Sequence, residues 1–280
     1  MPIDAQRLRT EGVYEAGIPL GSIFDDMRQI EVVLQETEVM RKKLRRFAGL
    51  ALLVFLALAI AAGVMSSAAV GFLAFVAFVF GLVLFIYSFV YGRSMHKHPA
   101  RLELTKALFQ SLQRDADKRA PFRVKLALKE QPKLLREEPF PQRKNGKQKF
   151  FEEEYLTIEG ELLDGTTVGE KVTELTRQRT FTNPRGKTKT KKRKRYLVTL
   201  RLDYPSDVYG DARPAQEALN EELRVPPSAA VRDLRVNEKA IAAKVLVESE
   251  QEIAQTCGMI SVGAYRILNL ARRVAAGGAK

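Results

Sequence analysis

The residues best suited to do chemistry are the cationic side chains that crowd positions 177 to 195. From position 185 to position 195, eight of eleven residues are Lys or Arg. Like charges at this density repel one another, and binding of an anionic partner relieves the repulsion. The sequence therefore predicts an anion-binding site composed of Arg177, Arg179, Arg185, Lys187, Lys189, Lys191, Lys192, Arg193, Lys194 and Arg195.

Other residue types that carry out catalysis form no recognisable motif in this sequence. It contains no glycine-rich phosphate loop, no GxSxG sequence and no CxxC pair. His96 and His98 have no Cys or carboxylate neighbours, and the single cysteine, Cys257, falls on an apolar helical stripe. The acidic triplet Glu152–Glu154 alternates sides on a strand, which favours neutralisation of nearby cations over acid–base catalysis. We expect a protein that is not an enzyme, with no metal site and no cofactor.

The net charge indicates which partners suit the chain. It has 46 basic and 33 acidic side chains, a formal charge of +13. The segment 119–203 alone holds 22 basic and 12 acidic side chains, a net charge of +10. Candidate partners are therefore anionic lipid headgroups, nucleic acid or an acidic protein surface. No aromatic residue lies between Lys187 and Arg195, which disfavours recognition of nucleic acid by base stacking.

A long uncharged apolar run indicates that the chain carrying these cations is anchored in a membrane. No charged residue occurs from Phe47 to Tyr91. At about 1.5 Å per residue, helices over 47–64 and 68–91 would be about 27 and about 36 Å long, and a bilayer core is about 30 Å thick. The turn between them, Met65–Ser67, is short and uncharged. The sequence therefore predicts a hairpin of two transmembrane helices.

The flanks of this hairpin predict its orientation. Basic residues precede the first span between Arg41 and Arg46, and Arg93, Lys97 and Arg101 follow the second. Because Lys and Arg are retained on the cytoplasmic side, both termini should be cytoplasmic. We expect a multi-pass protein of the inner (cytoplasmic) membrane.

The remaining chain divides around the hairpin. We expect an N-terminal cytoplasmic segment over 1–46, the hairpin over 47–91, a juxtamembrane connector helix over 92–121 and a cytoplasmic domain over 122–280. The first twenty residues look irregular, and Ile23–Leu44 reads as an amphipathic helix. Its apolar stripe could pack on the protein's own domain or pair with a second copy. The residues predicted for such oligomerisation are Ile23, Met27, Ile30 and Leu34.

Alternation of apolar and polar residues predicts strands from Phe122 onward. Strands are expected over 122–129, 151–163, 166–181, 187–203, 229–236 and 239–247, with a mobile loop over 131–149. The strand over 187–203 would be over 50 Å long at about 3.3 Å per residue, so its basic first half should project as a ribbon over about 177–195. An amphipathic helix over 250–275 should cover one face. The fold class is a membrane α-helical hairpin plus a cytoplasmic α+β domain with a mainly antiparallel sheet and a C-terminal amphipathic helix.

Three functions fit this organisation. The first is a non-enzymatic scaffold or adaptor of the inner membrane, whose basic ribbon contacts an anionic surface. The second is a membrane-tethered module that senses nucleic acid or nucleotides. The third is a repeating structural subunit of a larger membrane complex, or a homo-oligomer. No motif assigns the chain to a known family.

Overall fold

The structure of the chain is a computed structural model, which describes residues 8, 10–65, 68–93, 99–117, 119–140, 146–182, 186–215 and 223–277. Contacts within the backbone divide the chain into two units, each treated separately below. Unit 1 comprises Met1–Gly12 and Asp26–His98, and unit 2 comprises Val13–Asp25 and Pro99–Lys280. The second unit therefore contains chain from both sides of the apolar run.

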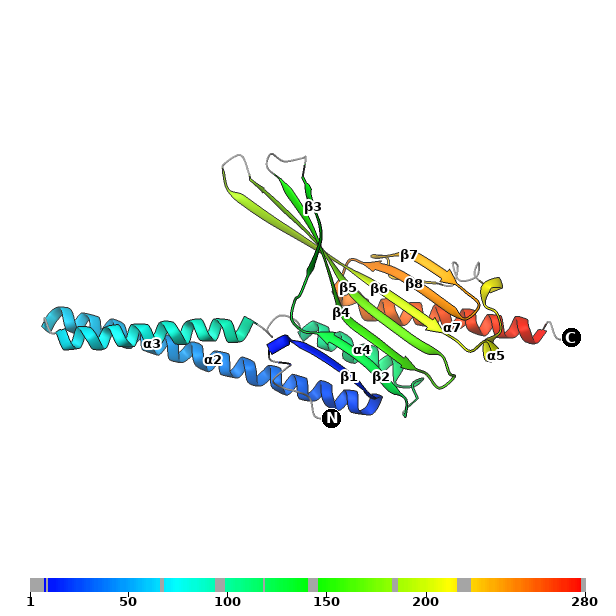
Figure 1. The fold of residues 1–280 in the computed structure, drawn as a ribbon, viewed down its shortest axis with the longest axis horizontal. Helices are drawn as coiled ribbons and strands as arrows, with labels where there is room; N and C mark the ends of the chain where they lie inside the picture. The colour runs from blue at the N-terminus through cyan, green and yellow to red at the C-terminus, as the bar shows by residue number, and fades with distance from the viewer. Residues whose placement is uncertain are drawn as a thin grey trace. The chain divides into compact units, whose positions relative to one another are not determined.

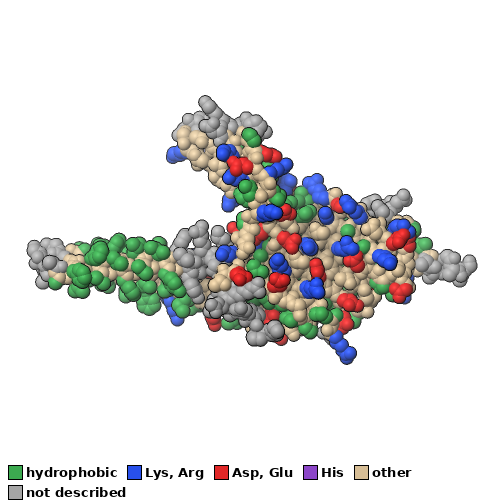
Figure 2. Space-filling model, in the orientation of Figure 1, with side chains coloured by type: hydrophobic (Ala, Val, Ile, Leu, Met, Phe, Trp, Pro, Cys, Tyr) green, Lys and Arg blue, Asp and Glu red, His purple; other side chains and the backbone are tan. Residues whose placement is uncertain are grey.

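Unit 1 is dominated by two long helices, α2 (Leu20–Met65), which enters this unit at Asp26, and α3 (Ala68–Arg93). Both are long and apolar enough to span a membrane, over Leu20–Ala61 and Ala69–Tyr87. Only 6% and 11% of the residues in their most apolar windows are buried, and apolar side chains cover the hairpin in Figure 2. Helices at the core of a soluble protein would bury these side chains. The expected amphipathic helix and first span are one continuous helix, since no Gly or Pro interrupts Leu44–Phe47.

Small residues let the two helices approach each other closely. A Cβ built on Gly81 of α3 would lie 3.2 Å from Ala51 Cβ and 3.5 Å from the Ala48 carbonyl oxygen of α2. Phe55 and Phe78 pack beside this point, with ring centroids 5.1 Å apart. Such close packing through small side chains is typical of helix pairs in lipid.

Unit 2 is an antiparallel sheet with helices on one face (Figure 1). The strand order is β1-β2-β4-β5-β6-β8-β7, and β3 pairs with the free edge of β4. The strands are β1 (Val13–Pro19), β2 (Pro121–Ala127), β3 (Lys133–Pro139), β4 (Lys147–Glu161), β5 (Thr167–Thr182), β6 (Thr188–Asp203), β7 (Ala229–Val236) and β8 (Ala240–Val247). The expected antiparallel sheet is confirmed.

Two helices cover the inner face of this sheet. Helix α4 (Pro99–Leu112) packs on β2 and β4, and α7 (Ile253–Gly277) packs on β6, β8 and α4. The expected C-terminal amphipathic helix is confirmed, because its apolar stripe is at most 3% exposed at each position: Ile253, Cys257, Ile260, Ala264, Ile267, Leu268 and Ala271. The described part of the unit also contains the short helices α5 (Ser206–Tyr209), η1 (Arg213–Ala215) and η2 (Glu250–Glu252). The other face of the sheet has no helix against it among the described residues.

Helix α4 belongs to the core of unit 2, whereas the sequence predicts a connector outside the domain over 92–121. Leu102, Leu108 and Phe109 are at most 2% exposed. The Phe109 ring meets Phe24 and Phe122 edge to face, with centroids 6.5 and 6.2 Å away. The folded unit therefore starts earlier than its first alternating strand suggested.

Two segments expected to be irregular are strands. β1 lies within the first twenty residues and pairs along its whole length with β2, from Val13 opposite Ala127 to Pro19 opposite Pro121. β3 lies within the expected loop over 131–149, where three prolines and many charges obscured it. Both are edge strands, and edge strands need less apolar character than central ones.

The long strands extend beyond the helix-covered part of the sheet. β3, together with Lys147–Glu152 of β4, Leu175–Thr182 of β5 and Thr188–Arg195 of β6, forms a four-stranded projection that we name the arm (Figure 1). β8 ends its pairing with β6 at Tyr196, so the outer edge of β6 in the arm has no strand beside it among the described residues. The basic residues of β5 and β6 expected in a ribbon lie in this arm, together with strands β3 and β4.

Candidate anion-binding site on the arm

The register of the arm sorts the predicted cations onto two faces. Arg177 of β5 stands directly opposite Arg193 of β6, and Arg179 stands opposite Lys191. Successive residues of a strand point to opposite faces, so Lys192 and Lys194 leave from the other side. The face with Arg177 continues the sheet face that no helix covers, and we name it the open face.

Like charges face each other across the strands of the open face, and such pairs destabilise a sheet. Burial, followed by repulsion from Arg179, Arg193 and Arg195, holds the pKa of Arg177 below its ordinary value. Arg179 donates a hydrogen bond from Nε to Gln148 Oε1 at 2.7 Å and lies over the Phe140 ring at 4.6 Å. These neutral partners orient Arg179 but leave its charge uncompensated.

At the foot of the arm the open face is hollowed into a groove of about 480 Å³. Its charged lining is Arg136, Arg177, Arg193 and Arg195, and the remaining lining is mostly apolar, with Leu135, Phe150, Phe151, Leu175, Thr176 and Leu246. We name this hollow the arm groove. Grooves of this size, with a few polar groups on an apolar lining, are typical of small-molecule sites.

Glu248 bridges two of the four arginines that line the arm groove, and Glu138 lies 3.2 Å from a third, Arg136. Glu248 Oε1 accepts hydrogen bonds from Arg193 Nη2 at 2.9 Å and from Arg195 Nη2 at 2.8 Å. Attraction to Arg193, then to Arg195, holds the pKa of Glu248 below its ordinary value. Glu248 directly follows the last residue of β8, at the point where the partner strand of β6 stops. Two lining arginines of the groove, Arg193 and Arg195, thus share the carboxylate of Glu248.

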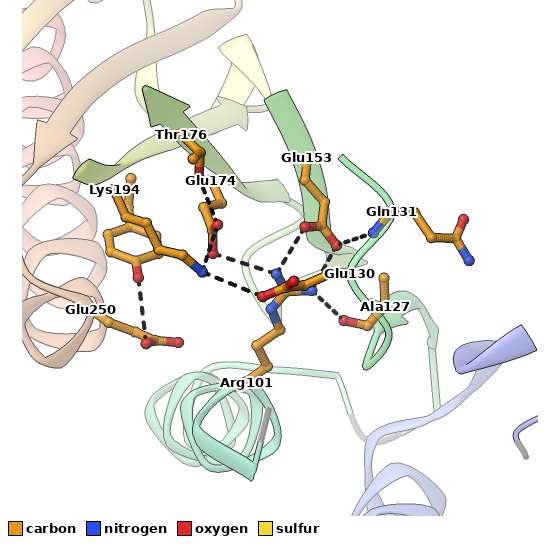
Figure 3. Close-up of polar contacts among 10 residues, drawn as sticks. Arg101, Ala127, Glu130, Gln131, Glu153, Glu174, Thr176, Lys194 and Glu250 are labelled. Atoms are coloured by element: carbon orange, nitrogen blue, oxygen red, sulfur yellow. Dashed lines mark hydrogen bonds and ion pairs between the residues drawn. The ribbon is translucent and has the colours of Figure 1, made fainter. Parts of the chain in front are cut away.

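On the opposite face of the arm root, the cations are part of a buried ion-pair network (Figure 3). Glu153 of β4 and Glu174 of β5 are register partners, so two carboxylates stand side by side. Arg101 of α4 lies 2.9 Å from Glu153 and 3.5 Å from Glu174, and Lys194 Nζ lies 2.8 Å from Glu174. All three network members from α4, β4 and β5 are almost fully buried.

Arg101 is the centre of this network. It donates two hydrogen bonds to Glu153 and one to the Ala127 carbonyl oxygen at 2.8 Å, and its guanidinium lies over the Tyr155 ring at 4.2 Å. Burial lowers the pKa of Arg101, and the Glu153 carboxylate outweighs that effect and raises it. The network fixes the root of the arm to α4. It is a structural element, because its charges compensate one another.

The structure brings most of the predicted anion-binding residues together and separates two of them. Arg177, Arg179, Lys189, Lys191, Arg193 and Arg195 occupy the open face of the arm, whereas Lys192 and Lys194 lie on the other face. Lys194 is engaged by Glu174 and Glu130. Lys187 precedes β6, and Arg185 lies outside the described residues. That these residues bind an anion stays a prediction.

Sequence reasoning missed the residues that complete the groove. Arg136 lies over the Phe150 ring at 4.3 Å. It belongs to β3, which lies within the loop expected over 131–149. Glu248 is 55 residues from Arg193 along the chain, and Leu246 belongs to the same distant strand. Only the register between β6 and β8 places them here, and one sequence carries no signal for that register. Glu248 could have been noted as the acid next to the expected end of a strand.

The stripe predicted for oligomerisation is largely withdrawn from solvent within one chain. Ile23, Met27 and Ile30 are at most 1% exposed, and Leu34 is half-buried. Arg101, one of the cations expected to flank the second span, is also fully buried. Self-association through the stripe stays a prediction.

Other chemistry in the described part of the chain is limited. No three His, Cys, Asp or Glu residues of that part cluster so that they could hold a metal ion. Burial raises the pKa of Cys257 well above its ordinary value, so the thiol stays protonated. His96 and His98 lie outside the described residues. A second hollow of about 410 Å³ on the open face is lined by Arg123 and Lys125 and by acidic residues. The opposite charges compensate one another, so this hollow has no strong electrostatic potential.

Comparisons of the chain with protein-family models, curated proteins and solved structures find no match. Its function is therefore inferred from its own geometry.

Proposed function

We propose that the protein is a non-enzymatic scaffold or adaptor of the inner membrane, anchored by α2 and α3, whose arm binds an anionic surface in the cytoplasm. The observation that carries this proposal is the pairing of two features in one chain. One is a hairpin with apolar side chains exposed along its length, and the other is an arm whose open face carries more cations than the acids near it.

The sheet supports the proposal that both termini lie on one side of the membrane. β1 precedes the apolar hairpin and β2 follows it, yet the two strands are hydrogen-bonded neighbours. A chain that crosses the bilayer between them must cross an even number of times. Two spans satisfy this condition. The cations at Arg41–Arg46 then favour the cytoplasm as the side that holds unit 2.

Lipid is the anionic surface that we favour over nucleic acid. Two aromatic rings at the arm already have an arginine over them, Phe150 with Arg136 and Phe140 with Arg179, and no aromatic residue lies between Lys187 and Arg195. Lys189 and Lys191 are exposed on the open face, and each Lys or Arg near an anionic membrane surface contributes up to about 1 kcal/mol. A bilayer anchor would also keep the arm near such a surface.

Labelling with an impermeant maleimide tests the anchor and its orientation. A cysteine is placed at Ser66, between the helices, or at Ser228 in unit 2, and intact cells are treated. We expect labelling at Ser66 and not at Ser228. The reverse pattern, or equal labelling of both, would refute the two-span orientation.

Vesicle binding tests the arm. The full chain is held in nanodiscs of phosphatidylcholine and mixed with vesicles that contain phosphatidylglycerol, or with single- and double-stranded oligonucleotides. Changing Arg179, Lys189 and Lys191, all on the open face, to Gln should weaken vesicle binding about tenfold or more. The matched control changes three exposed cations of the sheet body, Arg123, Lys125 and Lys244, to Gln, and this variant should bind vesicles like the parent.

Three results would contradict the proposal. Equal loss in both variants would mean that net charge alone attracts vesicles. Loss of oligonucleotide binding only would favour the nucleic-acid module. A parent protein that binds neither partner would direct the search to an acidic protein surface.

A further inference from the structure

We infer that the arm groove is a discrete site for the phosphate-bearing end of an amphiphile, with the phosphate on Arg177, Arg193 and Arg195 and the adjoining apolar group against Leu175 and Leu246. The inference rests on the proposed binding of the arm to an anionic surface and deepens it. It changes a diffuse electrostatic contact into a defined pocket that recognises one molecule.

The donors of the groove are incompletely used. Arg177 makes no hydrogen bond or ion pair with the part of the chain that the structure describes, although Arg193 stands directly opposite it. The Nε–H of Arg195 is buried and has no hydrogen-bond acceptor among the described residues. Arg136, by contrast, lies 3.2 Å from Glu138 and is engaged. Two of the four arginines thus keep donors available to a ligand.

The charge balance favours a phosphate over a single carboxylate. Arg177, Arg193 and Arg195 carry three positive charges, and Glu248 compensates one of them. Glu152, also on this face, has Lys133 as its own register partner. The excess of two charges matches a phosphomonoester, which carries about −1.5 to −2 at pH 7. Arginine forks also match the geometry of phosphate oxygens.

The apolar part of the lining favours an amphiphile over a free phosphate compound. Leu135 is 51% exposed, and Leu175 and Leu246 are half-buried beside the arginines. Apolar side chains left open next to cations gain stability only when an apolar group covers them. A purely electrostatic site would need no such lining.

Glu248 acts in this site as an internal competitor. Its carboxylate occupies the position between Arg193 and Arg195 that a phosphate oxygen would take. It is 48% exposed on a side chain at the end of a strand, so it can move aside. Binding therefore exchanges one internal ion pair for a more highly charged external one.

Calorimetric titration of the full chain in phosphatidylcholine nanodiscs tests the inference, with three soluble probes. Dihexanoyl phosphatidic acid presents a phosphomonoester with short chains, glycerol 3-phosphate presents the headgroup alone, and dihexanoyl phosphatidylcholine presents the chains with a neutral headgroup. We expect the phosphatidic acid to bind about tenfold or more tightly than glycerol 3-phosphate, since each buried CH₂ contributes about fourfold. The phosphatidylcholine should not bind measurably.

Matched variants separate the groove from the rest of the arm. Arg177→Gln with Arg193→Gln should weaken phosphatidic acid binding about tenfold or more. Lys189→Gln with Lys191→Gln removes the same charge from the same face outside the groove, and should cost less than about threefold. Glu248→Gln should strengthen binding at least about threefold, because the competitor is removed.

The outcomes distinguish this inference from the proposed function. Equal weakening in the two double variants, or equal affinity for phosphatidic acid and glycerol 3-phosphate, would overturn the amphiphile groove. If vesicles containing phosphatidylglycerol still bound through Lys189 and Lys191, the proposed function would stand without it. Failure of both vesicles and soluble probes to bind the parent would reject both. Each variant must unfold at the same temperature as the parent protein. Leu246→Ser is a second test, because it should weaken binding of dihexanoyl phosphatidic acid and leave binding of glycerol 3-phosphate unchanged.

Discussion

Glu170 is an ionisable side chain in the interior of unit 2, and replacing it with Gln should change how stability depends on pH. It lies on β5 beneath α7 and is 4% exposed. Its Oε1 accepts one long hydrogen bond from Ser261 at 3.4 Å, and its buried Oε2 has no partner among the described residues. Burial raises the pKa of Glu170 from 4.5 to about 7.

The sign and size of the effect follow from that difference. Below about pH 4.5 the carboxyl group is protonated in the folded and the unfolded chain, and ionisation costs nothing. Between pH 4.5 and 7 the unfolded chain releases a proton that the folded chain retains, so the folded state loses stability as pH rises. A difference of about 2.5 in pKa corresponds to about 3 kcal/mol, lost in full above pH 7.

Thermal unfolding of the full chain in detergent, followed by circular dichroism at pH 4.5 and pH 8, measures this loss. Glu170→Gln should match the parent within about 0.5 kcal/mol at pH 4.5 and exceed it by about 2–3 kcal/mol at pH 8. Glu161→Gln, at the exposed end of β4, is the matched control and should follow the parent at both values. A Gln variant with no advantage at pH 8 would refute the reasoning, because Glu170 would then be solvated in the folded state.

Three further predictions concern a buried ion pair, a close contact in the core and self-association. Arg101→Met should lower the free energy of unfolding by about 3–5 kcal/mol, because Glu153 and Glu174 would lose their buried counterion; chemical denaturation measures this, and a loss under 1 kcal/mol would contradict it. Gly160→Ala should cost about 1–3 kcal/mol, since its Cβ would lie 2.2 Å from the Phe122 ring, and Phe122→Leu in the same chain should recover part of the loss. Leu34→Asp should reduce the oligomeric mass in detergent if the stripe joins two copies, and an unchanged mass would reject that role.

Local sequence patterns predicted the parts of the fold that local physics determines. Alternation identified β2, β5, β7 and β8, and the stripe from Ile253 to Ala271 identified α7, because each element buries one face against its neighbours. The sequence analysis did not predict β1 and β3, because VYEAGIP and KLLREEP show no regular alternation of apolar and polar residues. About half of the residues of the candidate site could be predicted from the sequence. The cations lie consecutively in the chain, whereas Glu248 and Leu246 reach them only through a strand pairing that spans more than fifty residues.

The Arg101 network could be predicted only in part: the sequence indicates that the triplet Glu152–Glu154 neutralises nearby cations, but it does not identify Arg101 as the partner of Glu153. Glu153 and Glu174 were visible as acids on strands, and Arg101 as a basic residue after an apolar span. Their meeting depends on α4 turning back onto the sheet, which is a tertiary event. A charged side chain at a membrane boundary and one at the centre of a core look alike in a sequence.

The pairing of β1 with β2 has a consequence for the timing of folding. Val13 and Ala127 are register partners separated by 114 positions. At synthesis rates of about 5–20 residues per second, β1 waits roughly 6–23 s for its neighbour. During that wait it is an unpaired strand, open to chaperones or to wrong partners. The edge of the sheet closes only after the whole hairpin has been made and, in our proposal, inserted. Under our proposal that the hairpin spans a membrane, completion of the sheet requires that the chain has returned to the side from which it started.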